Sequence, residues 1–149
     1  PVFSIEKVYV KDLSLEVPNA PQVFLQAETP QLEVQLASAS ASIDGTLFET
    51  SVSVTVTAKV GEKTLFLVEV VQAGIFQIRG IPEAELPAVL GIVCPNVLFP
   101  YARETVSDTV NRAGFPPVLL APVNFEAIYQ QQQQAAQAGN GGSRIEIAH

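Results

Sequence analysis

Alternating apolar and polar residues predict a run of β-strands in the first half of the chain. The pattern is cleanest over residues 51–60, where valines and one alanine alternate with serine, threonine and lysine. A period of two with one apolar and one polar row is typical of a strand that buries one face. Turn signals at Asp44-Gly45 and Gly61-Glu62 flank this strand. Similar patterns predict further strands over residues 3–17, 31–43 and 65–72.

The first of these strands carries an acidic face. Its apolar row is Phe3, Ile5, Tyr9, Leu13 and Leu15. Lys7 and Lys11 interrupt that row, which indicates a bulge or an edge position in the sheet. Asp12 and Glu16 are four residues apart, so they share the polar face at a separation of about 13 Å along the strand. This spacing is too wide for a catalytic carboxylate pair and favours an acidic docking face.

The fourth strand is apolar on both faces. One row is Phe66, Val68, Val70 and Gln72, and the other is Leu65, Leu67, Glu69 and Val71. Helices packed on one side of a four-stranded sheet cannot cover both rows, so sheet-on-sheet packing with another subunit is the simplest solution. The segments Gly74-Ile75-Phe76 and Gly80-Ile81-Pro82 are expected to end the sheet.

An apolar run from Leu90 to Glu104 predicts a helix. Pro95 is expected to stop the segment before it, Asn96 to cap the helix, and Pro100 to fall in its first turn. The buried face predicted from helical spacing is Leu98, Ala102, Val106, Val110 and Ala113. Gly114 is expected just beyond the helix end. Because two prolines interrupt the run, we expect it to be too short and too broken to span a membrane.

Two connections and a last helix carry further apolar residues. Val23, Phe24 and Leu25 lie in a connection that runs to Pro30, and residues 115–122 form an apolar extended connector. Large apolar residues in irregular segments must be covered or line a groove. Asn124 is expected to cap a helix from Phe125 to about Ala138, with an apolar stripe of Phe125, Ile128 and Tyr129. The chain is thus predicted to form one domain over residues 1–138, followed by a flexible tail over residues 139–149.

Composition and charge narrow the possible partners. The chain has 149 residues, 48% of them hydrophobic and only 15% charged, which indicates buried oligomer contacts as well as a core. Its formal net charge is −7, the wrong sign for binding a nucleic-acid backbone. A basic or unstructured polypeptide fits this charge better.

Signatures of catalysis, cofactors and metals do not appear in the sequence. Cys94 is the single cysteine and lies in an apolar run, so we expect an inert buried thiol and a reducing compartment. His149 is the single histidine and is terminal, which leaves no internal serine or cysteine triad. Phosphate-binding glycine loops and zinc-ligand spacings are also missing. We therefore expect neither an enzyme nor a bound metal or cofactor.

Four motifs occur in a recognisable order. They are Val17-Pro18-Asn19-Ala20-Pro21, Gly74-Ile75-Phe76, the run from Leu90-Gly91 through Cys94-Pro95-Asn96 to Glu104, and Leu120-Ala121-Pro122-Val123-Asn124-Phe125. Together they resemble the signature of SecB, the bacterial protein-export chaperone family. The resemblance covers residues 3 to about 134 and does not extend into the tail.

The resemblance implies a fold, an assembly and a function. SecB subunits are α+β, with a four-stranded antiparallel sheet and helices packed on one side, and they assemble as a dimer of dimers. The homotetramer is an ATP-independent cytoplasmic holdase. It binds non-native secretory precursor proteins, keeps them unfolded and delivers them to the SecA motor ATPase, without inserting into the membrane itself.

The resemblance also implies site residues. The SecA-docking positions of the family fall on Asp12, Glu16, Leu67 and Glu69. The client-binding groove of the family points to Val23, Phe24, Leu25, Leu120, Phe125, Ile128 and Tyr129. An apolar groove with an acidic rim is what a holdase needs, because apolar contacts bind many sequences and negative charge speeds encounter with basic segments.

Two alternatives stay open from the sequence. One is an oligomeric α+β module whose groove binds a small apolar ligand, which requires a closed pocket. The other is a SecB-like chaperone dedicated to a single partner such as an antitoxin.

Overall fold

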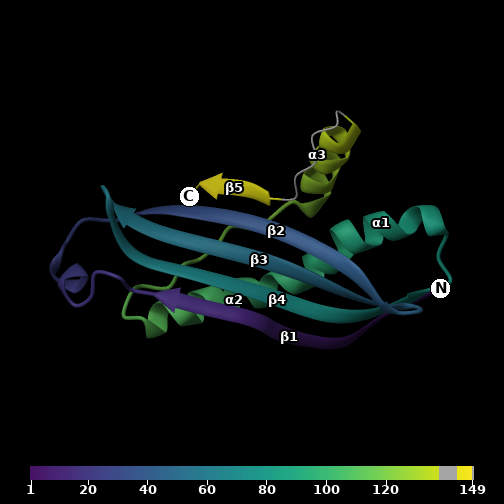
Figure 1. The fold of residues 1–149 in the computed structure, drawn as a ribbon, viewed down its shortest axis with the longest axis horizontal. Helices are drawn as coiled ribbons and strands as arrows, with labels where there is room; N and C mark the ends of the chain where they lie inside the picture. Colours follow the sequence, from purple (N-terminus) through teal and green to yellow (C-terminus); the bar gives the residue numbers. More distant parts are fainter. Residues whose placement is uncertain (138–143, 149) are drawn as a thin grey trace.

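Four long antiparallel strands form the framework of the molecule (Figure 1). The computed structural model describes residues 1–137 and 144–148. The elements of the sheet are β1 (Val2–Glu16), β2 (Gln31–Asp44), β3 (Leu47–Val60), β4 (Lys63–Arg79) and the short β5 (Arg144–Ala148). Their order is β1-β4-β3-β2-β5, and every neighbouring pair is antiparallel. The predicted four-stranded antiparallel sheet is confirmed, and a fifth strand is added at its β2 side.

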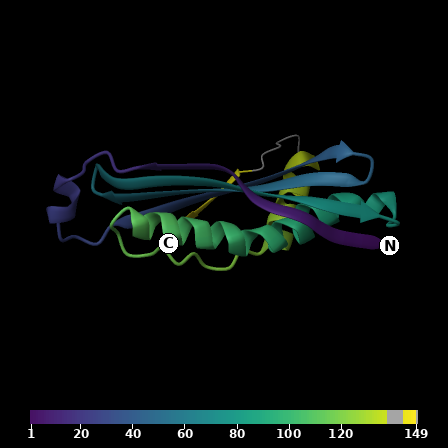
Figure 2. The ribbon, with the colours of Figure 1, turned by 90° about the horizontal axis from the view of Figure 1, so that it is seen from below.

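A long helix covers one face of the sheet (Figure 2). α2 (Cys94–Arg112) packs on β3 and β4. The predicted buried face is confirmed for Leu98, Ala102, Val106 and Val110, which have no exposed surface, whereas Ala113 is half-buried at the helix C-cap. The helix meets a layer of fully buried valines on the two strands: Val52, Val54, Val56, Val68 and Val70. Burying one such side chain stabilises the fold by roughly 1.5–3 kcal/mol, so this layer is the main core.

Two β-bulges in β1 change which of its residues face the helix. The register with β4 slips between Ile5 and Lys7 and again between Val10 and Asp12. Opposed residues of an antiparallel pair share a face. Tyr9, opposite Ala73, therefore lies on the face away from α2, while Val10 lies on the face toward it. The predicted bulge is confirmed, but the placement of Tyr9 in the apolar row is wrong, because each extra residue inverts the alternation beyond it.

β4 is longer than the sequence predicts. Gly74 lies inside this strand, opposite Val8 of β1 and Thr50 of β3, so the prediction that the sheet ends there is wrong. A Cβ atom at Gly74 would lie 2.9 Å from Cδ2 of Leu98, so glycine is what allows α2 to pack this closely. The strand ends before Gly80, whose φ of +74° favours glycine.

The helical region begins at Glu83, where the acidic residues Glu83 and Glu85 favour a helix start, and it continues through Pro95. The turns η2 (Glu83–Glu85) and α1 (Leu86–Ala88) lead into the π-helical segment η3 (Val89–Val93), which runs directly into α2. The N–H of Cys94 donates to the carbonyl of Val89, the spacing of a π turn. Proline has no N–H to donate and crowds the carbonyl four residues earlier in an α-helix. The wider turn before Pro95 relieves that crowding, so the predicted stop at this residue and the helix start at Asn96 are wrong.

The joined segments form one helical run, Glu83–Arg112, which is 30 residues long. Pro100 lies inside this run rather than in the first turn of α2. By length and composition the run could cross a membrane, so the expectation that it is too short is wrong. The core helix of a soluble protein passes the same test. Because α2 buries Leu98 and Val106 against the sheet, we interpret it as a core helix.

The last helix follows an extended connector. α3 (Phe125–Gln137) begins where predicted, and the side-chain oxygen of Asn124 accepts a hydrogen bond from the N–H of Ala127 at 3.0 Å, which confirms the predicted cap. The predicted flexible break over residues 139–143 lies outside the described residues. Within the predicted tail, residues 144–148 form β5 beside β2 (Figure 1).

Candidate functional site

The four predicted docking residues lie on one face of the sheet. Glu16 of β1 is opposite Leu67 of β4, and Asp12 is opposite Val71. Glu69 stands between those two β4 positions in the same row. The alternate row of β4 is buried under α2, so the docking row faces away from the helix. We call Asp12, Glu16, Leu67 and Glu69 the acidic face; their role in docking stays a prediction.

The carboxylates of the acidic face differ in exposure and form no ion pair within the described residues. Asp12 and Glu16 are exposed, whereas Glu69 is half-buried and accepts a hydrogen bond from the Thr55 hydroxyl at 3.1 Å. Within the described part of the chain, the ion pairs are Lys11 with Glu49 and Arg112 with Asp108, so none involves the acidic face. Carboxylates outside these ion pairs, beside the half-exposed Leu67, suit a partner with basic and apolar groups.

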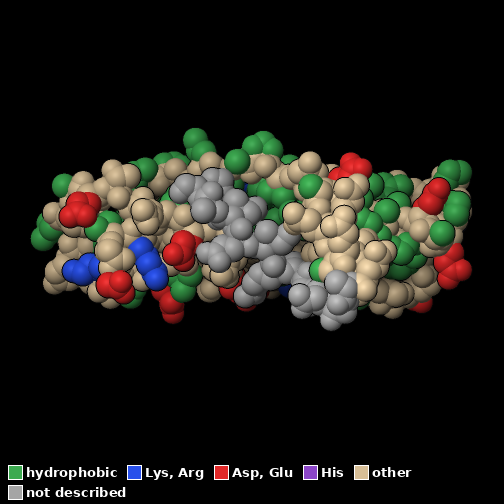
Figure 3. Space-filling view, turned by 90° about the horizontal axis from the view of Figure 1, so that it is seen from above, with side chains coloured by type: hydrophobic (Ala, Val, Ile, Leu, Met, Phe, Trp, Pro, Cys, Tyr) green, Lys and Arg blue, Asp and Glu red, His purple; other side chains and the backbone are tan. Residues whose placement is uncertain are grey.

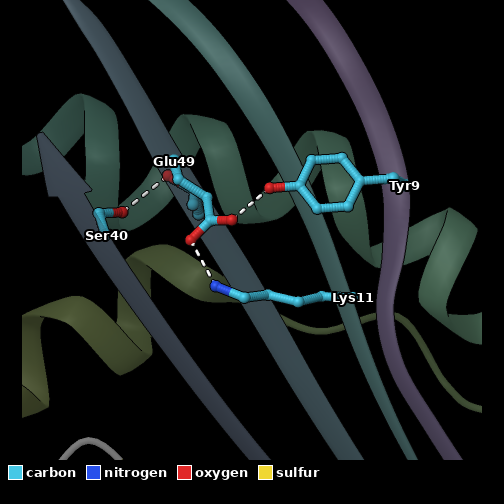
Figure 4. A network of polar contacts seen from close by, with 5 residues as sticks. Tyr9, Lys11, Ser40 and Glu49 are labelled. Carbon is cyan, nitrogen blue, oxygen red and sulfur yellow. Dashed lines mark hydrogen bonds and ion pairs between the residues drawn. The ribbon is translucent and has the colours of Figure 1, made fainter. Parts of the chain in front are cut away.

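A polar network braces the same side of the sheet (Figure 4). The Tyr9 hydroxyl and the Lys11 ammonium both donate to the Glu49 carboxylate, the lysine at 2.8 Å. Burial, together with the hydrogen bond to Glu49, raises the pKa of Tyr9 to about 12. The hydrogen bond from Lys11, and then that from Tyr9, lowers the pKa of the Glu49 carboxyl. The network links β1 to β3 across β4 and therefore holds the strand that carries Asp12 and Glu16 in place.

An aromatic groove lies at the opposite end of the sheet from the β2–β3 turn. It has a volume of about 660 Å³. Three aromatic rings pack in a row along it, tilted to one another, with Phe115 between Phe24 and Phe66 at centroid distances of 5.1 and 4.9 Å. Val23 and Leu120 also line it. The 3₁₀ turn η1 (Gln22–Leu25) supplies one wall, and the connector after α2 supplies the other.

Two local features shape this aromatic groove. The side-chain amide of Asn19 donates to the carbonyl of Thr64 at 2.8 Å and so anchors the connection that carries η1 to the β3–β4 turn. Gly114 has a φ of +97°, and a Cβ atom there would lie 3.0 Å from the ring of Phe24. Only glycine fits both the backbone and the space, so this residue ends α2 and leaves room for the aromatic wall.

The predicted client-binding residues fall in different places. Val23, Phe24 and Leu120 line the aromatic groove, and Leu25 is 87% exposed beside it. Phe125 is buried and packs edge-on against Phe99 at 5.9 Å, away from the groove. Their part in client binding stays a prediction.

Two further predicted residues belong to α3. Ile128 is half-buried against the core, and Tyr129 packs on η3, where a Cβ atom at Gly91 would lie 2.6 Å from its ring. Tyr129 also borders a smaller pocket of about 160 Å³ next to Ser40. The α3 residues therefore form a second patch, separate from the aromatic groove.

Cys94 is the first residue of α2 and is fully buried. Burial raises the pKa of its thiol to about 11, and the Thr50 hydroxyl that hydrogen-bonds to it offsets this only in part. The thiolate is the reactive form of cysteine, so a raised pKa agrees with the predicted inert thiol.

Residues 1–136 match the protein family described as preprotein translocase subunit SecB. The chain belongs to the SecB family. A curated relative, the protein-export protein SecB of Chromobacterium violaceum, is 67% identical over 141 residues, which cover 94% of each chain. The protein of the same name from Neisseria gonorrhoeae is 59% identical over 140 residues, which cover 93% of this chain and 95% of its own.

A solved structure agrees with this SecB fold. The SecB-like chaperone of Mycobacterium tuberculosis, in complex with a ChAD peptide from the antitoxin HigA1, matches with a TM-score of 0.67. The match covers 81% of this chain and 90% of the other, at 20% sequence identity. At that identity the likeness supports the fold alone.

Several groove residues of this SecB chain were not among the predicted client-binding residues, although three of them lie in the apolar connector over residues 115–122. Leu32, Leu65, Phe66, Phe115, Val118 and Leu119 all line the aromatic groove. Phe66 looked like an ordinary core residue because its strand alternates, and Phe115 stood in a connector without a periodic pattern. The signal that could have found Phe115 is its place directly after Gly114, where the chain must turn back on the sheet.

Proposed function

We propose that this SecB chain is an ATP-independent holdase for non-native secretory precursors, which it binds in the aromatic groove and delivers to the SecA motor through the acidic face. The name protein-export protein, carried by relatives 59–67% identical to it, supports the export role. The aromatic groove is the observation that carries the proposal. It presents Phe24, which is 47% exposed, and Leu119, which is 84% exposed, in one apolar surface.

Such a groove suits an unfolded chain better than a unique ligand. Packed aromatic rings offer large apolar contacts without a fixed set of hydrogen bonds, so many sequences can bind. A folded protein hides its apolar segments, so binding selects the non-native state. The proposal needs no catalytic group, nucleotide or metal from this chain.

The acidic face supports the handover step. Asp12, Glu16 and Glu69 lie on the face away from α2, and the aromatic groove uses other residues, so a client and SecA can be bound at once. Acidic side chains also gather at both ends of the view in Figure 3, whereas Lys and Arg are few and lie mostly toward one end. This charge attracts basic segments of clients and of a docking partner.

Exposed apolar residues support assembly as a dimer of dimers. One row of β1 carries Phe3, Ile5, Val10, Leu13 and Leu15, each 38–49% exposed. Val93 and Tyr101 add an exposed apolar patch on the helical side, at 42% and 51%. A second copy of the chain is the partner that fits these surfaces, because a surface that pairs with its own copy forms a closed dimer. Four equivalent grooves would let one long client bind several times, so weak contacts add up to strong retention.

We place this chaperone in the cytoplasm, where its precursors are made. A dedicated chaperone for one partner remains the second candidate, because the structurally similar M. tuberculosis protein was solved with an antitoxin peptide. Binding to several unrelated unfolded proteins would rule out that narrower role.

A refolding assay tests the proposal. The purified protein, without nucleotide, should delay the refolding of a slow-folding precursor, and Phe24→Ala should weaken this delay. The matched control is Ile43→Ala, which removes another apolar side chain about half exposed, at the far end of β2. Equal delays with both variants would remove the aromatic groove from client binding. No delay with the unaltered protein would end the holdase proposal.

A further inference from the structure

The segment β5 occupies the outer edge of β2. It pairs antiparallel with β2 over five positions, from Ala148 opposite Glu33 to Arg144 opposite Ala37. Ile145 and Ile147 hold the register positions opposite Leu36 and Val34. Arg-Ile-Glu-Ile-Ala also alternates in sequence, which is the period of a strand. The chain therefore supplies its own extended strand to one edge of the sheet (Figure 1).

The β2 edge lacks the protection that edge strands normally carry. From Gln35 to Ile43 it contains neither a charged residue nor a proline, and its register with β3 runs without a shift up to Ser42. β1, at the other edge of the sheet, carries Lys7, Lys11 and two bulges. Charges and bulges are the usual means of blocking strand addition, and a smooth uncharged edge accepts an added strand. β2 is thus open to pairing and β1 is guarded.

The connection to β5 is short. Six residues, 138–143, join the end of α3 at Gln137 to Arg144. Six residues span at most about 20 Å, so the tail strand stays near β2 at an effective concentration on the order of millimolar. At that concentration even a weakly pairing five-residue strand competes with free peptides.

We propose that the β2 edge is a strand-accepting site, and that the tail strand Arg144–Ala148 occupies it and excludes extended peptide segments from elsewhere. The peptides that fit are those that alternate apolar and polar residues, as the tail does. Main-chain hydrogen bonds supply the affinity of such β-augmentation, so the site tolerates many sequences. The effect of the tail on client binding rests on the proposed holdase function. The exchange of one strand for another at the β2 edge rests only on the observed pairing of β5 with β2.

The tail acts here by competition. A client segment can pair with β2 only in the fraction of molecules in which β5 has left. Weakening the tail strand should therefore increase the fraction of molecules with a free β2 edge. The affinity for an added strand should increase by the same factor. Loss of one or two net backbone hydrogen bonds makes that factor about tenfold.

The test uses the full chain with Glu146→Pro and Ile147→Pro together. Consecutive N–H groups of a strand point to opposite sides, so one of the two prolines must remove a donor to β2. The matched control, Glu146→Gln with Ile147→Val, keeps both donors. We expect amide hydrogen exchange within residues 33–37 to be about tenfold faster in the proline variant than in the control. Exchange in β1 should be the same in both and serves as an internal reference.

A synthetic peptide of residues 143–149, added in trans, completes the test. It should bind the proline variant about tenfold more tightly than the control and should restore the slow exchange of residues 33–37. Unchanged exchange in the proline variant, or equal peptide affinity in both proteins, would overturn the proposal. Neither readout needs holdase activity. Failure of the refolding delay with both variants would therefore count against the proposed function and leave the strand exchange standing.

Discussion

Tyr9 and Glu49 join the edge strand β1 to β3 over the top of β4, through a hydrogen bond from the tyrosine hydroxyl to the carboxylate. The two residues are 40 positions apart in sequence. The contact depends on the first bulge in β1, between Ile5 and Lys7, which turns Tyr9 away from α2. One polar network on the sheet thus fixes the strand from which Asp12 and Glu16 project.

This network predicts a pH dependence of stability. Lys11 and Tyr9 lower the pKa of the Glu49 carboxyl below its usual value of 4.5, so below that pH the unfolded chain binds more protons than the folded one. The stabilisation is fully present above about pH 4.5 and is lost as the pH falls through the lowered pKa. Glu49→Gln should reduce the free energy of unfolding at pH 7 by on the order of 1 kcal/mol. Thermal unfolding from pH 7 to pH 3 should show a smaller acid loss in this variant; an unchanged slope would refute the assignment.

Replacing Gly114 should disturb the aromatic groove as well as the stability of the fold. Gly114→Ala should lower the free energy of unfolding by about 1–2 kcal/mol, because its φ of +97° disfavours a side chain. It should also weaken client binding, because the new methyl group displaces the Phe24 ring. Gly45→Ala is the matched control: its φ of +59° imposes a similar strain, but nothing lies within 4 Å of the added atom. Client titrations that show equal affinity for both variants would contradict the placement of Phe24 in the groove.

Gly91 predicts how α3 is held. In Gly91→Ala the added Cβ atom would lie 2.6 Å from Tyr129, so α3 should shift away from η3 and its amides should exchange faster. Helix propensity alone would favour alanine by about 1 kcal/mol, so a net loss of stability reports the clash. Tyr129→Ala in the otherwise unaltered chain should also speed this exchange, because it removes the same contact. Slow exchange in both variants would show that the contact does not hold α3.

Glu69 predicts a charge effect on docking. Glu69→Lys should leave client binding unchanged and should weaken SecA binding at low salt, because it reverses one charge of the acidic face. Glu62→Lys makes the same charge change in the exposed β3–β4 turn and serves as control. Binding isotherms at two salt concentrations give the measurement. Equal loss in both variants would indicate a general charge effect rather than a site.

The sequence predicted most of the strands and the buried face of α2, because both follow from regular periodicity. It failed at Tyr9, at Gly74 and at Pro95, where a bulge, a close helix packing and a π turn override the local rule. These features depend on the neighbouring element rather than on the residue itself. Pattern reasoning could not supply them without the partner strand or helix.

The candidate site divides in the same way. The acidic face came from strand alternation and family resemblance together, since Asp12 and Glu16 share a row that meets Leu67 and Glu69. The aromatic groove was only partly predicted. Phe66 and Phe115 come together because the chain after Gly114 returns to the start of β4, a long-range contact without a periodic signature.

Site-specific photo-crosslinking tests the central claim that the aromatic groove holds non-native polypeptide. A photoreactive phenylalanine analogue in place of Phe24 should crosslink to an unfolded precursor and should not crosslink to the same precursor after it has folded. The same analogue in place of Ile43, which is 51% exposed at the far end of β2, gives the comparison for an apolar position outside the groove. Crosslinks at position 24 in the unfolded state alone are the predicted result. Equal labelling at positions 24 and 43, or labelling by folded precursor, would contradict the account.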